Sequence, residues 1–215
     1  MKTGILFDLD GTLLDSLEDL KDAVNYALAQ YDCPPRTLEE VRQFVGNGAA
    51  RLIHLALPGK DNDPDPDRVL ETYKAYYELH AQDKTGPYPG IPEALAAIRA
   101  RYPVAVVSNK PDGAVKLLCR EFFGDIYALG ESLACPRKPA PDMLYQAMKD
   151  LGVDRCVYVG DSEVDAITAK NAGLPCVSVL WGFRDRACIE EAGGTHFCQD
   201  PAQLLTIIEE VLHGK

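Results

Sequence analysis

Four short apolar segments rich in β-branched residues divide the chain, and none of them alternates between apolar and polar positions. They are GILFD (4–8), VAVVSN (104–109), CVYVGD (156–161) and PCVSVLWG (175–182). A strand without alternation is typical of a parallel sheet that is buried on both faces. We therefore predict a parallel sheet built from these segments.

Helical patterns accompany the later strands. One begins near Pro92 and covers 92–102, a second ends at Gly152, and a third ends at Gly173. Proline suits the first turn of a helix and glycine its exit. Alternating strands and helices indicate a Rossmann-like α/β domain with right-handed crossovers, in which reactive groups lie at the carboxyl ends of the strands.

The interval from about Leu17 to Lys84 has no clear strand pattern. Apolar residues recur there at helical spacing, TLEEVRQFVG opens with a Thr37/Glu40 capping box, and RVLETYKAYYELH supplies a further helix. The acidic, proline-interrupted segment 61–67 indicates a solvated loop. We predict a helical domain over 16–84, inserted into an α/β core formed by 1–15 and 85–215.

Composition narrows the class of protein. The chain has 215 residues, 47% of them hydrophobic, and 22 Lys and Arg against 33 Asp and Glu give a net charge of -11. This charge argues against a sequence-independent nucleic-acid binder and against binding to anionic membranes. An anionic substrate would need cations at its own site.

The cysteines and the apolar runs indicate a compartment. Seven cysteines without a C-x-x-C pair suit reduced thiols better than disulfides or a zinc site. No apolar run approaches the roughly 20 residues of a membrane helix, and the N-terminus leads directly into a strand. We expect a cytoplasmic protein.

Polar groups follow the predicted strands. FDLDGTLLDS could be a strand with an ordinary Asp-Gly turn, or a catalytic and metal-binding pair, because residues two apart project to one side if strand geometry persists. Prolines on both sides of residue 140 fix the helix onset behind a lysine. The groups expected at one sheet edge are Asp8, Asp10, Ser108, Asn109, Lys138, Asp161 and Asp165.

Electrostatics indicates what this edge holds. Two carboxylates about 4 Å apart repel by roughly 4 kcal/mol at an effective dielectric of about 20, so several of them require a compensating cation. Lys138 can neutralise one. The remaining ligands are oxygens, which favours Mg²⁺ over zinc or copper and suits a site for a phosphoryl group.

The motifs FDLDGTLLDS, VVSNK, RKPAPDMLYQAM and VGDSEVDAITAKNAG, in this order, resemble those of the haloacid dehalogenase superfamily, in its phosphatase branch with a helical cap. The resemblance covers essentially the whole chain. Three further stretches, VGNGA (45–49), PYPGIPEAL (87–95) and SNKP (108–111), are similar to the phosphoglycolate phosphatases.

The resemblance implies a role for each motif residue. Asp8 is expected to attack phosphorus and form an aspartyl-phosphate, and Asp10 to act as acid and base. Ser108 and the Asn109 backbone would bind the phosphoryl group, and Lys138 would hold it near Asp8. The expected metal ligands are Asp8, Asp10, Asp161 and Asp165, the last through a water or by orienting Lys138; Asp165 could also simply favour a helix N-terminus.

The residues of the cap that act at the site are less clearly indicated by the sequence. Gly46, Asn47 and Gly48 suggest a turn that folds over the site, although glycine is also common at a helix end. Candidate partners for a substrate carboxylate are Arg42, Arg51 and Lys110, each of which could equally be a solvated charge.

We therefore expect a Mg²⁺-dependent phosphomonoester hydrolase acting on a small phosphorylated metabolite, most similar to phosphoglycolate phosphatase, as a monomer or homodimer. Alternatives are an inorganic pyrophosphatase, a sugar-phosphate phosphatase and a β-phosphoglucomutase. Leu20 stands where the mutases carry histidine, which weakens the last of these. A non-catalytic phospho-ligand sensor would be expected to lack Asp8 or Asp10, and both are present.

Overall fold

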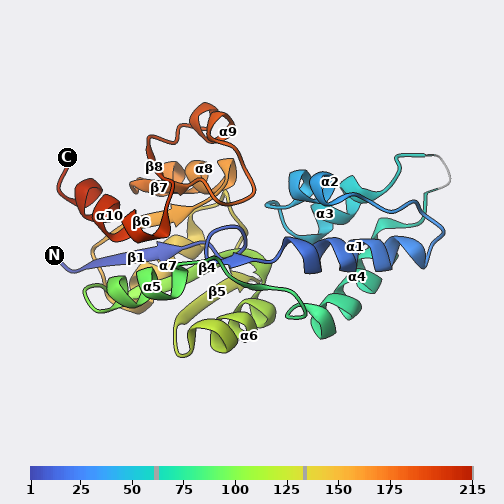
Figure 1. Ribbon diagram of the computed structural model, residues 1–215, viewed down its shortest axis with the longest axis horizontal. Helices are drawn as coiled ribbons and strands as arrows, with labels where there is room; N and C mark the ends of the chain where they lie inside the picture. The colour runs from blue at the N-terminus through green and yellow to red at the C-terminus, as the bar shows by residue number, and fades with distance from the viewer. Residues whose placement is uncertain (61–62, 133–134, 215) are drawn as a thin grey trace. The chain divides into compact units, whose positions relative to one another are not determined.

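The computed structural model describes residues 1–60, 63–132 and 135–214, and the chain forms two compact units. Met1–Leu14 and Pro87–Lys215 form an α/β unit, and Asp15–Gly86 form a helical unit (Figure 1). The α/β character expected from the sequence is confirmed.

The α/β unit is built on a six-stranded sheet in the order β5-β4-β1-β6-β7-β8, and every neighbouring pair is parallel. In the central register, Ile5 of β1 pairs with Val104 of β4 and with Val157 of β6. The strands are β1 (Thr3–Phe7), β4 (Val104–Pro111), β5 (Tyr127–Glu131), β6 (Arg155–Gly160), β7 (Cys176–Val179) and β8 (His196–Cys198).

The four predicted strands correspond to β1, β4, β6 and β7, with ends that differ by a few residues. The two edge strands, β5 and β8, were not predicted. In β5 the burial alternates, because one side of an edge strand is less covered, and β8 has only three residues. Neither therefore shows the continuous apolar run that marks a buried parallel strand.

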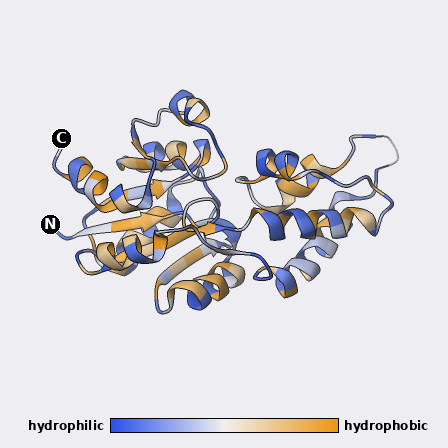
Figure 2. Ribbon diagram, viewed as in Figure 1, coloured by the Kyte–Doolittle hydropathy of each residue, from blue (hydrophilic) through white to orange (hydrophobic). Residues whose placement is uncertain are grey.

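Helices cover both faces of the sheet, and the central strands carry mostly hydrophobic residues (Figure 2). On one face α7 and α8 pack over Leu6, Val107 and Tyr158 in a continuous core. Ile5 and Phe7 point to the other face, since side chains alternate along a strand. The helices of this unit are α5 (Ile91–Arg99), α6 (Asp112–Phe123), α7 (Asp142–Leu151), α8 (Glu163–Ala172), α9 (Arg186–Glu191) and α10 (Leu204–Leu212), with the short η1 (Pro201–Gln203).

Local sequence signals account for several helix ends. Gly152 ends α7 and Gly173 ends α8, each in the left-handed conformation that glycine adopts without strain. At the start of α8, Ser162 and Asp165 form a reciprocal capping box. The start of α8 is therefore fixed by two residues of the fourth motif.

The helical unit contains α1 (Leu17–Ala29), α2 (Leu38–Phe44), α3 (Ala49–Ala56) and α4 (Pro66–His80). The predicted Thr37/Glu40 capping box is present at α2. Helix α3 was not predicted, because its eight residues begin directly after the turn-like sequence Gly46, Asn47 and Gly48. Of the predicted loop at 61–67, Asp61 and Asn62 lie outside the described residues, and α4 already begins at Pro66.

The chain enters and leaves the helical unit through two short paired strands, β2 (Leu14–Asp15) and β3 (Gly86–Pro87). Beside them, the buried carboxylate of Asp19 in α1 accepts hydrogen bonds from Lys84 N and from both N and Oγ1 of Thr85. The first helix of the unit is thus tied to its last residues. Within the described part of the chain, no helix has the length and apolar character needed to cross a bilayer.

Candidate active site

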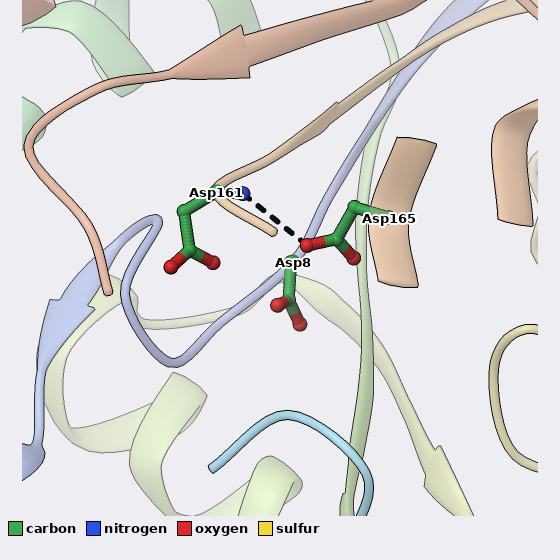
Figure 3. Close-up of side chains that lie close together, drawn as sticks. All are labelled: Asp8, Asp161 and Asp165. Carbon is green, nitrogen blue, oxygen red and sulfur yellow. Dashed lines mark hydrogen bonds between the residues drawn. The ribbon is translucent and has the colours of Figure 1, made fainter. Parts of the chain in front are cut away.

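Three adjacent strands end at the candidate site. Asp8 follows β1, Ser108 to Lys110 form the last part of β4, and Asp161 follows β6. Because β1 lies between β4 and β6 and all three are parallel, their carboxyl ends share one edge of the sheet. The carboxylates of Asp8, Asp161 and Asp165 converge there (Figure 3).

Lys138 lies at the centre of this cluster and is 3% exposed. Its Nζ is 2.8 Å from Asp8 Oδ1 and 2.8 Å from Asp165 Oδ1. A third contact is a hydrogen bond of 2.9 Å to the hydroxyl of Tyr158. The contacts with Asp165 and Tyr158 are hydrogen bonds and the contact with Asp8 is an ion pair, so the buried charge is compensated.

Asp165 is enclosed by donors. Its Oδ1 accepts from Lys138 and from the Tyr158 hydroxyl, which is 2.8 Å away. Its Oδ2 accepts from Asp161 N at 3.2 Å and from N and Oγ of Ser162 at 3.1 and 2.6 Å. Both carboxylate oxygens are therefore committed to the protein, which favours a positioning role over direct metal binding.

Asp161 is held from two sides. Its Oδ1 accepts from the Thr12 hydroxyl at 3.3 Å and its Oδ2 from Phe183 N at 2.7 Å. Two glycines let the backbone approach this closely. A Cβ on Gly182 would lie 2.3 Å from Asp161 Cβ, and one on Gly11 would lie 2.3 Å from Asp161 Oδ2. Larger residues at either position would displace the carboxylate.

Asp10 has a different cationic partner from Asp8. β1 ends at Phe7, and Asp10 instead forms an isolated bridge to Leu14. The side chain of Asp10 pairs with Lys110, whose Nζ is 3.0 Å from Asp10 Oδ1. The strand geometry that would place both carboxylates side by side does not continue to Asp10.

The end of β4 supplies polar groups to the same edge. The buried Ser108 hydroxyl accepts a hydrogen bond of 3.2 Å from Lys110 N. Asn109 turns its side-chain amide to the backbone of Lys138, accepting from Lys138 N at 2.6 Å and donating to Lys138 O at 3.0 Å. The Asn109 amide thus links β4 to the segment that carries the central lysine.

The carboxylates differ in proton affinity. Burial raises the pKa of Asp8 well above its usual range, against the lowering effect of Lys138. Burial and the neighbouring Asp165 raise the pKa of Asp161 to about 7. For Asp165 the effect of burial is outweighed by Lys138 and by hydrogen bonds from Ser162 and Tyr158, and its pKa is lowered. Asp8 and Asp161 therefore require a further cation to stay ionised together.

The donor set fits a hard divalent cation. One oxygen from each of Asp8, Asp161 and Asp165 lies within 4.8 Å of the other two. Asp8 Oδ1 contacts Lys138 as an ion pair but has no partner of hydrogen-bond geometry among the described residues. Because Asp165 is already saturated, Asp8 and Asp161 are the carboxylates best suited to hold a cation such as Mg²⁺.

A family model described as haloacid dehalogenase-like hydrolase matches residues 5–179, which include Asp8, Lys138, Asp161 and Asp165. The chain belongs to the haloacid dehalogenase-like hydrolases. The resemblance inferred from the four motifs is confirmed.

Two relatives of this hydrolase carry the name of one activity. A phosphoglycolate phosphatase of Cereibacter sphaeroides is 40% identical over 190 residues, covering 84% of this chain and 86% of the relative. Phosphoglycolate phosphatase 1 of Pseudomonas aeruginosa is 33% identical, covering 96% and 79%. These relatives and the family together indicate that the chain is a phosphatase.

Solved structures extend the similarity to the whole fold. A Lactobacillus delbrueckii protein provisionally named a phosphoglycolate phosphatase has a TM-score of 0.88 and 37% identity, and the match covers 100% of both chains. CbbY from Rhodobacter sphaeroides, solved in complex with phosphate, has a TM-score of 0.78 and 27% identity, covering 97% of this chain and 100% of the other.

The structure of this hydrolase brings together Asp8, Ser108, Asn109, Lys138, Asp161 and Asp165, and it places the Asp10–Lys110 pair at the end of β4. Gly46 and Asn47 belong to the helical unit, where they lie between α2 and α3, and Gly48 is the N-cap of α3 with φ of 81°. Arg51 is exposed, and Arg42 lies 3.9 Å from Glu39.

Sequence reasoning missed three contributors to the site. Tyr158 is hidden inside the apolar run of β6, Thr12 resembles an ordinary turn residue, and Phe183 acts through its backbone. A tyrosine in an otherwise aliphatic buried strand is a usable signal, because its hydroxyl needs a partner when buried. A backbone donor leaves no trace in the sequence.

Proposed function

We propose that this phosphatase hydrolyses a small phosphate monoester, 2-phosphoglycolate in the first instance, through a covalent intermediate on Asp8 and with Mg²⁺ as its cofactor. The observation that carries the proposal is the buried Asp8 carboxylate, 2.8 Å from the Lys138 ammonium and grouped with Asp161. The substrate is suggested by the names of the relatives at 33 to 40% identity.

In the first step an oxygen of Asp8 attacks phosphorus, forming a carboxyl–phosphate bond as the bond to the substrate oxygen breaks. The leaving alkoxide takes a proton from Asp10. In the second step Asp10 accepts a proton from water, which attacks phosphorus, releases phosphate and restores the Asp8 carboxylate. Asp10 thus returns to the protonation state in which it began.

The remaining groups position the phosphoryl group and compensate its negative charge. Lys138 contacts Asp8 and is oriented by Asp165 and Tyr158, so it can hold a phosphoryl oxygen beside the nucleophile. We assign to the Ser108 hydroxyl, which is buried at the end of β4, and to the backbone at Asn109 the hydrogen bonds to the same group. Mg²⁺ held by Asp8, Asp161 and the Asp10 backbone carbonyl would screen the negative charge that an anionic nucleophile must approach.

Substrate selection is assigned to the helical unit as part of the proposal. Gly46 and Asn47 lie on a connection in which Gly46 has φ of 119°, a backbone conformation that glycine adopts readily. Such a connection can present backbone N–H groups to a small anion. Lys110, by contrast, already pairs with Asp10, so it is a weaker candidate for a substrate carboxylate.

The test is phosphate release from 2-phosphoglycolate, with pyrophosphate and sugar phosphates measured in parallel. Turnover is expected with Mg²⁺, absent after chelation and restored by added Mg²⁺. Asp8→Asn is expected to abolish turnover without loss of fold, and the exposed Asp125→Asn serves as the matched control.

The outcomes separate the parts of the proposal. Preference for 2-phosphoglycolate in kcat/KM supports the substrate, whereas turnover confined to another ester or to pyrophosphate removes the substrate and keeps the chemistry. Normal activity of Asp8→Asn contradicts the nucleophile. If no compound shows Asp8-dependent turnover, the result favours the alternative hypothesis of a non-catalytic phospho-ligand sensor.

A further inference from the structure

Lys138 is placed by its backbone as well as by its side chain. It lies in the connection between β5 and α7, outside any regular helix or strand. A backbone N–H and C=O buried in such a connection cannot use the partners that a sheet or helix supplies. The position of the ammonium, 2.8 Å from Asp8, therefore depends on whatever holds this peptide.

The side chain of Asn109 supplies both partners. Its Oδ1 accepts from Lys138 N at 2.6 Å and its Nδ2 donates to Lys138 O at 3.0 Å. Because a side-chain amide carries the same two groups as a peptide, Asn109 pairs with Lys138 as one peptide pairs with another in a sheet. Both residues are buried, so water does not replace these bonds easily.

The geometry of this pair links two of the family motifs. Asn109 is in β4, next to Ser108; β4 pairs with β1 at Val104 to Val106 and with β5 on both sides of Asn109, at Val107 and Pro111. The position of β4 is fixed by its neighbouring strands, whereas Lys138 lies outside any helix or strand. Asn109 thus transfers the fixed position of β4 to the lysine that contacts Asp8.

We infer that Asn109 is a positioning residue that acts through Lys138. Its side chain fixes the position of the Lys138 backbone at the carboxyl edge of the sheet, so that the ammonium reaches Asp8, Asp165 and Tyr158 together. The role is separate from that of the Asn109 backbone, which is assigned to phosphoryl binding. The inference rests on the proposed function and adds a second duty to the same residue.

Other side chains could hold this segment, and one of them provides a matched control. Asn171 donates from Nδ2 to Pro139 O at 2.9 Å, so it bonds the carbonyl next to that of Lys138. Asn171 belongs to α8 and is exposed, so water can replace its hydrogen bond to Pro139. The two variants each remove one asparagine side chain that bonds this segment. Asn109 makes two buried hydrogen bonds to Lys138, whereas Asn171 makes one exposed hydrogen bond to Pro139.

The experiment measures kcat and KM for Asn109→Ala and Asn171→Ala, together with amide hydrogen exchange at Lys138. For Asn109→Ala we expect kcat to fall by about 10- to 100-fold with a smaller change in KM, because misplacing a catalytic group by about 1 Å is sufficient for such a loss. Exchange at the Lys138 amide is expected to become faster while exchange in β4 at Val106 stays slow. Asn171→Ala should change kcat by less than about threefold.

Two outcomes overturn the inference. One is an unchanged kcat in Asn109→Ala although the Lys138 amide exchanges faster, and the other is unchanged exchange at Lys138. If Asn109→Ala does not fold, Asn109→Asp replaces it, because its carboxylate still accepts from Lys138 N but places an oxygen against Lys138 O. The same loss of kcat is expected there, and full activity contradicts the inference.

The two failures are distinguishable. Wild-type protein without Asp8-dependent turnover refutes the proposed function and this inference with it. Wild-type protein with Asp8-dependent turnover, joined to full activity of the Asn109 variants, refutes the inference alone. A combined Asn109→Ala, Lys138→Met variant adds a further criterion: a residue that acts only through Lys138 should cause no additional loss once Lys138 is replaced.

Discussion

The ammonium of Lys110 lies 3.0 Å from Oδ1 of Asp10, and its side chain is only 5% exposed. The neighbouring strand end holds the second such contact, between Lys138 and Asp8 at 2.8 Å. Each of the two aspartates after β1 therefore has its own lysine. This separation supports the proposed mechanism, in which Asp8 is the nucleophile and Asp10 exchanges protons.

Lys110→Met should lower kcat/KM by about 10- to 100-fold, because Asp10 loses the cation that fixes it. Lys116→Met is the matched control, since Lys116 forms an exposed ion pair with Asp112 at 2.6 Å. That control should leave kcat/KM within about twofold of wild type. Equal activity of Lys110→Met and wild type would show that Asp10 does not depend on this pair.

Asp165→Asn should destabilise the fold by about 3–5 kcal/mol, because it leaves the buried Lys138 ammonium with one carboxylate fewer. The free energy of unfolding is measured by urea denaturation. Asp142→Asn, at an exposed position in the first turn of α7, should change it by less than about 1 kcal/mol. A similar small change in both variants would contradict the structural importance of Asp165.

The stability of the metal-free protein should fall as the pH rises from about 4 to about 7. Asp161 has a folded pKa of about 7, raised by burial and by Asp165, whereas an unfolded aspartate titrates near 3.9. The folded state binds more protons in this window, so the contribution is complete below it and lost above it. Asp8, whose pKa is also raised, acts in the same direction.

This pH dependence is measured as the unfolding midpoint in chelator between pH 4.5 and 7.5. Asp161→Asn should show a shallower slope than wild type. Added Mg²⁺ should also flatten the slope, because a bound cation favours the ionised carboxylates. Parallel curves for wild type and Asp161→Asn in chelator would argue against the raised pKa.

Gly182→Ala should raise the Mg²⁺ concentration needed for half-maximal activity by at least about tenfold. The added Cβ would lie 2.3 Å from Asp161 Cβ and 2.4 Å from the Gly11 carbonyl, so Asp161 must move. Gly113→Ala in α6 is the control, because a Cβ there meets nothing within 4 Å. An unchanged Mg²⁺ requirement in Gly182→Ala would mean that Asp161 is not a ligand.

The fold was predictable where the chain repeats one physical rule over several residues. Continuous apolar runs marked β1, β4, β6 and β7, and the order of motifs placed Asp8, Ser108 and Asp161 at strand ends. Edge strand β5 was missed because its burial alternates, and α3 because two of its neighbouring glycines suggested only a turn. In each case tertiary contacts, which a local pattern does not contain, decide the structure.

The candidate site was predictable as a set of residues but not as a set of contacts. The charged residue types and the order of the four motifs identified Asp8, Lys138 and Asp165. The pairing of Asp10 with Lys110, in contrast, depends on where β1 ends. The contact of Asn109 with a backbone 29 residues away also follows from the fold alone. Sequence patterns identify chemical groups, and three-dimensional packing chooses their partners.

The bonds from Asp19 to Lys84 and Thr85 join the beginning and the end of the helical unit. A segment closed at its base in this way can be lengthened, shortened or exchanged for another without altering the register of β1 and β4. Under the proposed assignment of substrate selection to the helical unit, evolution can vary that unit as a whole while the reaction chemistry is inherited unchanged.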